Sequence, residues 1–327
     1  MKKTMPKDAT IAITYKCNAR CVMCNIWQKE KKPELALEIY KKLPSSLEEI
    51  NITGGEPFLR SDLPEIINVI NKTCNYPRII ISTNGLLPDI LDKSLAKIQC
   101  YSKNNIGIGL SLDGIGGKHD KIRGIPGAYS KVLQSLDVVK KNNFKNIRLA
   151  FTMSDLNFNE LLKVYELSRK LKVDFSWIVA QSSSHYFGIN IKLTADNAKK
   201  NIKDLIQKQL KSWRPKTLAR AYFSNALYEF IFKQPPKYPW QCQAMNSSFF
   251  LDPYGDIYPC NALNQKAGNI LSQSFQEIWF SKEADKICEI TKKCQKCLMI
   301  CSARETIKKH WLQVGWWILR HKRYKSQ

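Results

Sequence analysis

The sequence predicts an α/β fold in which six strand–helix units build an incomplete parallel (β/α)6 barrel. Three observations support this prediction: short β-branched runs recur through residues 8–200, amphipathic helical segments separate them, and several runs end at glycine-containing turns. Regular alternation of strands and helices is typical of parallel βα units. The chain has 327 residues and 44% hydrophobic content, which is enough for one large or two ordinary domains with a full core.

The six predicted strands are short and apolar, and each is followed by a loop or a helical segment. They are residues 10–14, 49–53, 78–82, 106–112, 147–153 and 173–179. Apolar residues at helical spacing predict the segments between the strands. These are a helix face at 35–43, a helix that opens at Asp62, and helices at 87–98, 129–141 and 156–171. Asp62 and Glu65 have the spacing of a capping box.

The strand–helix pattern stops near residue 194, where helices alone continue to about residue 232 and a proline-rich link follows at 234–239. We therefore divide the chain into four parts. They are a core barrel at 8–200, a helical extension and linker at 201–235, a cysteine-rich module at 240–303 and a basic, tryptophan-containing helix at 304–327.

Composition limits the class of protein. No secretory signal precedes the first cysteines, and no run of eighteen apolar residues is present, so we expect a reducing, cytoplasmic location. The net charge of +24 favours anionic partners, although a lysine-rich proteome would produce the same surplus. We expect no nucleic-acid partner.

Three cysteines follow the first predicted strand at spacings that suit a metal cluster. Cys17, Cys21 and Cys24 lie in one loop, and thiolates are the ligands expected for iron–sulfur centres. A four-iron cluster held by three cysteines leaves one iron open to another ligand. The alternative is a structural zinc site completed by a distant His or Cys.

A glycine-rich turn follows the second predicted strand. It consists of Gly54, Gly55, Glu56 and Pro57, and the paired glycines allow a ligand to approach the backbone closely. In parallel βα folds this turn and the cysteine loop lie at the same end of the sheet, where ligands bind.

Together, the CxxxCxxC loop and the Gly-Gly-Glu-Pro turn resemble the motifs of the radical S-adenosylmethionine (SAM) superfamily. The resemblance implies a TIM-like partial barrel and a catalytic [4Fe-4S] cluster on Cys17, Cys21 and Cys24. It also implies that SAM binds the fourth iron and that residues 54–57 bind its ammonium group. An electron from the cluster then cleaves SAM, and the resulting 5′-deoxyadenosyl radical removes hydrogen from a substrate. An electron donor such as flavodoxin or ferredoxin is also implied.

Weaker matches to the same family follow the third and fourth strands. Ser82 and Asn84 occupy positions where the family often contacts the ribose, Ser111 and Asp113 follow the fourth strand, and Arg123 could pair with the SAM carboxylate. Asn84 and Asp113 also precede glycine, so ordinary turn formation is an alternative. His119 and His185 have no partner evident in the sequence, and we assign them no role.

A second cysteine group lies near the C-terminus, and it resembles the SPASM and twitch modules that follow many radical SAM barrels. The candidate ligands are Cys242, Cys260, Cys294, Cys297 and Cys301. The cysteine spacing departs from the full SPASM pattern, so we expect one auxiliary [4Fe-4S] cluster held by four of the five. A zinc ribbon is the alternative. Cys74, Cys100 and Cys288 are read as ordinary thiols.

The tail from residue 306 onward has no acidic residue, and Ile307, Trp311, Val314 and Ile318 form a helical stripe. A basic amphipathic helix of this kind can attach peripherally to the inner membrane surface. Docking on the rest of the protein is the alternative.

The sequence thus predicts a radical SAM oxidoreductase-type enzyme that oxidises or rearranges a small polar, sugar-like metabolite with help from an auxiliary cluster. A peptide-modifying maturase is the first alternative. A non-enzymatic zinc-binding adaptor is the second, and it leaves residues 54–57 unexplained.

Overall fold

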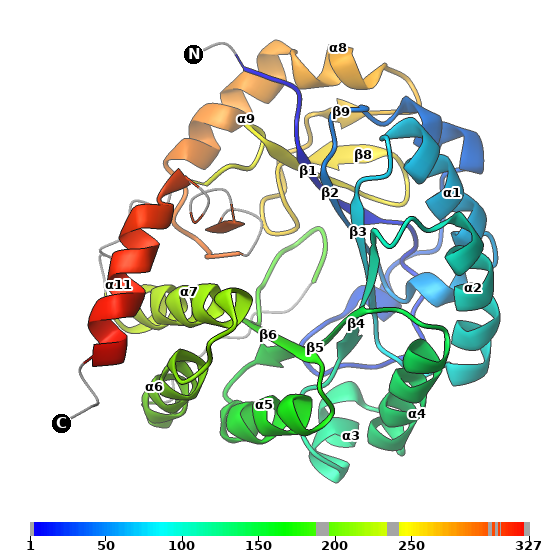
Figure 1. The fold of residues 1–327 in the computed structure, drawn as a ribbon. Helices are drawn as coiled ribbons and strands as arrows, with labels where there is room; N and C mark the ends of the chain where they lie inside the picture. The colour runs from blue at the N-terminus through cyan, green and yellow to red at the C-terminus, as the bar shows by residue number, and fades with distance from the viewer. Residues whose placement is uncertain are drawn as a thin grey trace.

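The computed structural model describes residues 3–187, 196–233, 242–299, 303–304, 307 and 309–323. A curved nine-stranded sheet forms its centre, with the strand order β6-β5-β4-β3-β2-β1-β7-β8-β9 (Figure 1). The six core strands are β1 (Asp8–Ala12), β2 (Glu49–Thr53), β3 (Arg78–Thr83), β4 (Ile106–Ser111), β5 (Asn146–Met153) and β6 (Asp174–Val179). All five pairings between them are parallel, and β6 and β9 are the sheet edges. The predicted incomplete parallel barrel is therefore confirmed.

One face of these strands is apolar and packs against helices outside the barrel. The helices are α1 (Leu63–Thr73), α2 (Pro88–Tyr101), α3 (Gly117–Arg123), α4 (Ala128–Lys141) and α5 (Leu161–Lys170), joined by short turns η1 (Ile26–Gln28), η3 (Pro57–Leu59) and η4 (Phe158–Glu160). Ile52, Ile81 and Leu149 are fully buried in this layer. Removal of such side chains from water supplies most of the stabilisation of the barrel.

The other face of the strands lines the barrel lumen, and along β4 and β5 its side chains are small or polar. In β5, Asn146, Arg148, Ala150 and Thr152 alternate with buried residues and stay partly exposed, although β5 lies between two other strands. The neighbouring positions of β4 are Gly107, Gly109 and Ser111. The part of the lumen beside β4 and β5 is therefore lined by glycine, alanine and polar side chains.

Two local predictions need correction. The segment at 35–43 forms the 3-10 helix η2 (Leu37–Lys42) instead of an α-helix. Asp62 precedes α1, but its side chain makes no capping bond. Its carboxylate instead accepts two hydrogen bonds from Arg60, at 2.8 and 2.5 Å. The Arg60 guanidinium thus competes with the backbone N–H groups of the helix for the Asp62 carboxylate. The predicted capping box is wrong.

The cysteine-rich module continues the barrel sheet. Its strands β7 (Ser248–Leu251) and β8 (Asp256–Tyr258) form an antiparallel hairpin, followed by β9 (Gly268–Asn269), α8 (Phe275–Trp279) and α9 (Lys282–Lys292). The sequence did not predict that β7 pairs in parallel with β1. The proline-rich link at 234–239 lies outside the described residues.

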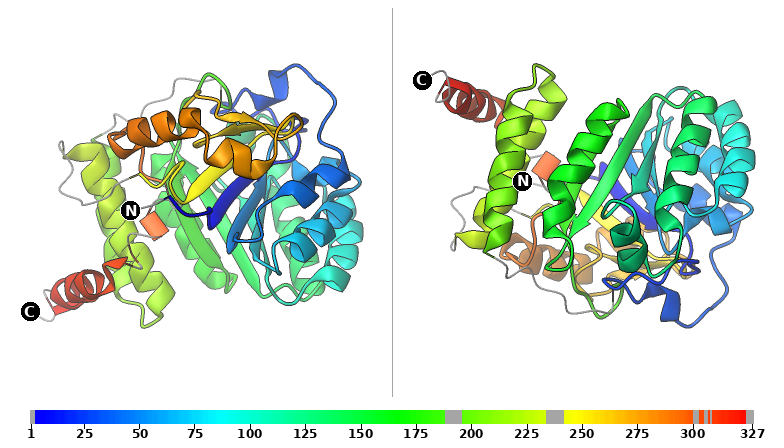
Figure 2. Two further views of the ribbon diagram at one scale, coloured as in Figure 1. Left: turned by 90° about the horizontal axis from the view of Figure 1, so that it is seen from above. Right: turned by 90° about the horizontal axis from the view of Figure 1, so that it is seen from below.

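The helices α6 (Asn197–Leu210) and α7 (Pro215–Phe232) cover the side of the barrel next to β6, and α11 (Trp311–Arg323) packs against the outer side of these two helices (Figure 2). Trp177 of β6 donates a hydrogen bond to Ser224 of α7 at 2.9 Å. Trp317 of the tail helix contacts Tyr222 of α7, with ring centroids 5.3 Å apart. The tail therefore docks on the protein, which favours that alternative over membrane attachment.

This docking buries one part of the predicted apolar stripe of the tail helix and leaves another part exposed. Val314 is buried, whereas Trp311 is 67% exposed. Of the helices in the described part of the chain, none combines the length and apolar character that crossing a membrane requires.

Candidate active site

The cysteine loop extends from the carboxyl end of β1 and is held by its neighbours. Arg20 and Val22 donate backbone hydrogen bonds to the carbonyls of Arg123 and Ile122, both at 2.9 Å. Glu56 donates its backbone N–H to Lys16 at 2.8 Å. The loop is thus tied to the end of α3 on one side and to the turn after β2 on the other.

Both glycines of that turn are required by the close approach of the two loops. Gly54 has a φ of 144°, and a Cβ there would lie 2.2 Å from the carbonyl oxygen of Thr14. A Cβ at Gly55 would lie 2.2 Å from the carbonyl of Lys16 and 2.9 Å from Cβ of Cys17. The two glycines therefore allow the cysteine loop to lie directly against this turn, which fixes the position of Cys17. The sequence predicted only that they would allow a ligand to approach the backbone closely.

Glu56 is buried and points into the protein. Its carboxylate accepts hydrogen bonds from the backbone N–H of Phe58 at 3.1 Å, the hydroxyl of Thr83 at 2.7 Å and the backbone N–H of Asn84 at 2.7 Å. Burial raises the pKa of this carboxyl to about 7. Glu56 and Pro57, both buried, thus connect the turn after β2 to the turn after β3.

Asp113 and Arg123 form a buried ion pair beside the cysteines. Arg123 Nη2 lies 2.5 Å from Asp113 Oδ2, and its Nη1 lies 3.6 Å from the sulfur of Cys21. Asp113 also accepts the backbone N–H of Thr152 at 2.7 Å. Asp113 and Arg123, which were both predicted to contact SAM, therefore lie at the cysteine end of the barrel. One Nη atom of the Arg123 guanidinium is paired with Asp113.

The other predicted SAM contacts lie at the same end of the barrel or in the lumen. Asn84 Nδ2 lies 3.9 Å from the sulfur of Cys17 and 2.8 Å from Asn18 Oδ1. Ser82 donates to Asn51 at 2.9 Å inside the lumen, and Ser111 is the last, partly exposed residue of β4. Direct contact of these residues with SAM stays a prediction.

The cysteine loop has the chemistry that an iron–sulfur cluster needs. Cys17 and Cys24 are partly buried, and burial raises the pKa of their thiols to about 12 and about 11. Binding of a metal cluster would deprotonate them, because the thiolate is the ligand. Within the described residues, no group of three or more His, Cys, Asp or Glu side chains is placed to hold a single metal ion. Three thiols in one loop are a donor set that suits an iron–sulfur cluster.

His119 is a structural residue. It is fully buried, and its Nδ1 accepts the backbone N–H of Asp113 at 3.0 Å. Burial lowers its pKa to about 3. The imidazole is therefore neutral at pH 7 and supports the turn that carries Asp113.

The sequence did not point to the aromatic residues between the two cysteine groups. Tyr186 donates its hydroxyl to the carbonyl of Gly54 at 3.0 Å and packs on Phe250, with centroids 5.1 Å apart. His185 packs on Tyr258 at 4.6 Å, and its Nε2 lies 3.2 Å from the carbonyl oxygen of Cys260. Only two adjacent aromatics after the sixth strand, Tyr186 and Phe187, offered a local signal, and such a pair is equally typical of a core loop.

The structure brings some of the auxiliary cysteines together. Cys260 follows β8, and its sulfur accepts hydrogen bonds from the backbone N–H groups of Ala262 and Leu263 at 3.4 Å each. The Cys294 thiol lies close enough to contribute to the raised pKa of the Cys260 thiol. Cys242 and Cys297 are partly buried in flanking loops, and Cys301 lies outside the described residues. Cys74 and Cys288 are buried, and Cys100 is exposed in α2.

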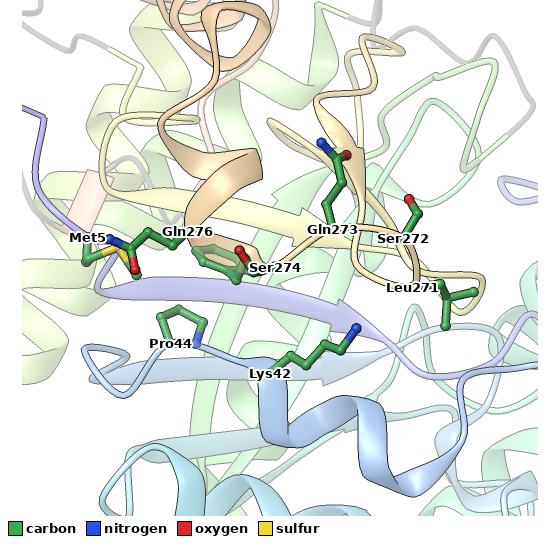
Figure 3. A pocket seen from close by; sticks show the side chains of 9 residues that line it. Met5, Lys42, Pro44, Leu271, Ser272, Gln273, Ser274 and Gln276 are labelled. Carbon is green, nitrogen blue, oxygen red and sulfur yellow. The ribbon is translucent and has the colours of Figure 1, made fainter.

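A shallow surface pocket of about 450 Å³ lies away from these cysteines (Figure 3). It is lined by side chains from the segment before β1, the end of η2 and the β9–α8 connection: Met5, Lys42, Pro44, Leu271, Ser272, Gln273, Ser274, Phe275 and Gln276. Lys42 donates to the carbonyl of Ile270 at 2.8 Å. The lining carries no thiol, imidazole or carboxylate, and we assign it no chemistry.

Comparisons with known proteins agree with this site. Residues 11–168 match the Radical SAM superfamily, and residues 242–298 match SPASM, an iron–sulfur cluster-binding domain. The chain is 27% identical to the AdoMet-dependent heme synthase of Methanosarcina barkeri, over 89% of this chain and 91% of that protein. It is 25% identical to the mycofactocin maturase MftC of Mycolicibacterium smegmatis, over 85% of this chain and 71% of that protein.

The fold is also similar to that of Streptococcus suis SuiB bound to precursor peptide SuiA. The TM-score is 0.62 at 18% identity, with 90% of this chain and 70% of SuiB covered. The matched residues include the three loop cysteines, the turn after β2, and Cys242, Cys260, Cys294 and Cys297. The cofactors of this enzyme are therefore SAM with a [4Fe-4S] cluster, together with auxiliary iron–sulfur binding. The chain belongs to the radical SAM superfamily and carries a C-terminal SPASM domain.

Proposed function

We propose that this radical SAM enzyme modifies a peptide, one residue of which enters the barrel lumen from the cysteine end. The observation that carries the proposal is the lumen itself. Its β4 positions are Gly107, Gly109 and Ser111, and the β5 residues beside them stay partly exposed, so these two strands present no large apolar side chain to a substrate. The maturase relative and the peptide-bound fold support a peptide better than they support a sugar-like metabolite. The heme synthase relative makes a small-molecule substrate the competing proposal.

In this proposal the chain positions its groups as follows. Cys17, Cys21 and Cys24 would hold the catalytic cluster, and the Arg123 guanidinium lies against the sulfur of Cys21. When bound, the cluster and SAM supply one electron and a carbon-centred radical that removes a hydrogen atom from the substrate. The barrel around this end excludes water and competing hydrogen donors. Cys242, Cys260, Cys294, Cys297 and Cys301 remain the candidates for the auxiliary cluster, and a flavodoxin or ferredoxin would supply electrons.

Deuterium transfer tests the peptide proposal. Extract from cells that encode this chain, grown in heavy water, would be incubated without oxygen with the enzyme, unlabelled SAM and dithionite. We expect deuterium in the 5′-deoxyadenosine product, and we expect it to disappear when the extract is first treated with a nonspecific peptidase. Transfer that survives the peptidase and follows the small-molecule fraction would replace the peptide with a metabolite. A chain with Cys17, Cys21 and Cys24 changed to alanine is the background control.

A further inference from the structure

The floor of the lumen, at the amino ends of the strands, is lined by charged residues. Asp8, Glu49, Arg78 and Asp174 are each the first residue of a strand. Arg220 of α7 and Arg304 reach the same region, since Arg220 pairs with Asp174 at 3.3 Å and Arg304 pairs with Asp8 at 2.9 Å. This floor is opposite to the cysteine end of the barrel.

Most charges of the floor are paired. Arg78 lies 3.3 Å from Glu49, and Arg304 lies 3.0 Å from the same carboxylate. Lys216 and Arg220 share Asp174. The three carboxylates are thus already engaged by four cations.

Arg148 is a fifth cation, and it is the one that has no acceptor among the described residues. Its Nε is shut off from solvent and makes no hydrogen bond. Its side chain lies across β4, because a Cβ on Gly109 would meet Nε at 3.1 Å. Burial, and then the neighbouring Arg220, Arg304 and Arg78, lower its pKa to about 10, while the more weakly acting Asp174 opposes this shift.

We propose that Arg148 binds a carboxylate of the substrate at the floor of the lumen. A guanidinium offers a planar fork that matches a carboxylate, and a partly buried cation without an acceptor is stabilised when an anion binds it. This inference rests on the proposed function and narrows it to a peptide that inserts a carboxylate-bearing group, either an acidic side chain or its C-terminus.

The position of Arg148 determines how far from the cysteine end the carboxylate of the substrate would bind. Arg148 precedes Thr152 by four residues on β5, which is about 13 Å at about 3.3 Å per residue. Thr152 is bonded to Asp113, the partner of Arg123 at the cysteine end. A bound carboxylate would therefore fix a substrate whose reacting carbon lies several bonds away, nearer to the cysteines.

Binding of a simple dicarboxylate tests the site. The probe is glutarate, with glutaramide as its neutral analogue and inorganic phosphate as a different oxyanion, all at constant ionic strength. The protein is the full chain with its clusters, as wild type, Arg148→Gln, and the control Arg169→Gln at an exposed position of α5. We expect glutarate to bind wild type and Arg169→Gln equally, and to bind Arg148→Gln about ten- to a hundredfold more weakly.

Two results would overturn the inference: equal glutarate binding by Arg148→Gln, or equal binding of glutaramide by wild type. Tighter binding of phosphate than of glutarate would replace the carboxylate with a phosphate group. If Arg148→Gln fails to fold, protection of Arg148 from phenylglyoxal in the wild-type chain decides the matter, because glutarate should slow its modification and leave that of Arg169 unchanged.

The two proposals fail separately. Peptide modification by an enzyme that binds no glutarate at Arg148 would remove only the carboxylate site. Glutarate binding at Arg148 in an enzyme that modifies no peptide would remove only the peptide assignment. To separate the two sources of carboxylate, peptides identified as substrates would be compared with their C-terminal amides.

Discussion

The two ends of the barrel lumen hold buried charge in opposite ways. At the cysteine end, Arg123 lies 2.5 Å from Asp113, and Glu56 accepts three hydrogen bonds from its neighbours. At the floor, Arg148 has no acceptor among the described residues. The ion pair and the Glu56 hydrogen bonds connect the turns around the cysteine loop before any ligand binds, although Nε of Arg123 also makes no hydrogen bond among the described residues. A charge left without a partner costs stability and is available to a ligand. The following predictions test this contrast, from the largest expected effect to the smallest.

Loss of the loop cysteines should have the largest effect. Changing Cys17, Cys21 and Cys24 to alanine should remove about four irons per chain, because a [4Fe-4S] cluster loses its thiolates. SAM cleavage should fall below detection. Anaerobic iron and sulfide analysis, with 5′-deoxyadenosine measured by chromatography, checks both. The control is Cys100→Ala, which is exposed on α2. Full iron content in the triple variant would place the cluster elsewhere.

Breaking the buried pair at the cysteine end should strongly destabilise the fold. Asp113→Asn leaves the Arg123 guanidinium buried without a counter-charge, which should cost about 3–5 kcal/mol. Anaerobic urea denaturation measures this change. Asp92→Asn, in an exposed pair with Lys141 at 3.1 Å, should leave the midpoint almost unchanged. Equal effects of the two substitutions would contradict the contrast between buried and exposed pairs.

Replacing one hydrogen-bond-accepting oxygen of the Glu56 carboxylate should have an intermediate effect on stability. Glu56→Gln keeps the shape but turns an amide NH2 group toward one of the three donors, so about 1–3 kcal/mol should be lost. Because Asn84 lies beside Cys17, SAM cleavage should also slow. The urea midpoint and the rate of 5′-deoxyadenosine formation are the two measurements. The exposed Glu38→Gln is the control, and it should alter neither.

A substitution at the floor of the lumen should not lower the stability of the protein. Arg148→Met removes a partly buried cation whose Nε has no acceptor among the described residues, so without added anions the protein should be unchanged or about 1 kcal/mol more stable. The same anaerobic urea titration measures it. A loss of several kcal/mol, as expected for Asp113→Asn, would show that Arg148 is satisfied within the protein.

Local patterns in the sequence were enough to predict the barrel and the position of the cysteine loop. β2 has the predicted bounds, and the other core strands differ by one or two residues at their ends. Hydrophobic runs and turn residues act within a few positions of one another, so the sequence reports them directly. Asp62 shows the limit of this reasoning, because Arg60 competes with the helix terminus for its carboxylate.

The candidate site was predicted where short motifs carry its chemistry and missed where distant residues meet. Cys17, Gly54 and Gly55 lie together as the motifs indicate, with the glycines required by backbone contact. Tyr186 was missed because its role depends on the carbonyl of Gly54, far away along the chain. The aromatic contacts that lead from Tyr186 through Phe250 to Tyr258 likewise join separate parts of the sequence.

The sequence by itself determined the strand–helix order, the cysteine loop, the glycine turn and the presence of a second cysteine group. Those features depend on residues close together in the chain. Only the tertiary structure decided that β7 joins the barrel sheet beside β1, and that Arg148 finds no acceptor in the described part of the chain. Both depend on which strands pair and in what register. Parallel pairing brings together residues that no local pattern connects, so the charge balance of the lumen emerges only when the sheet is assembled.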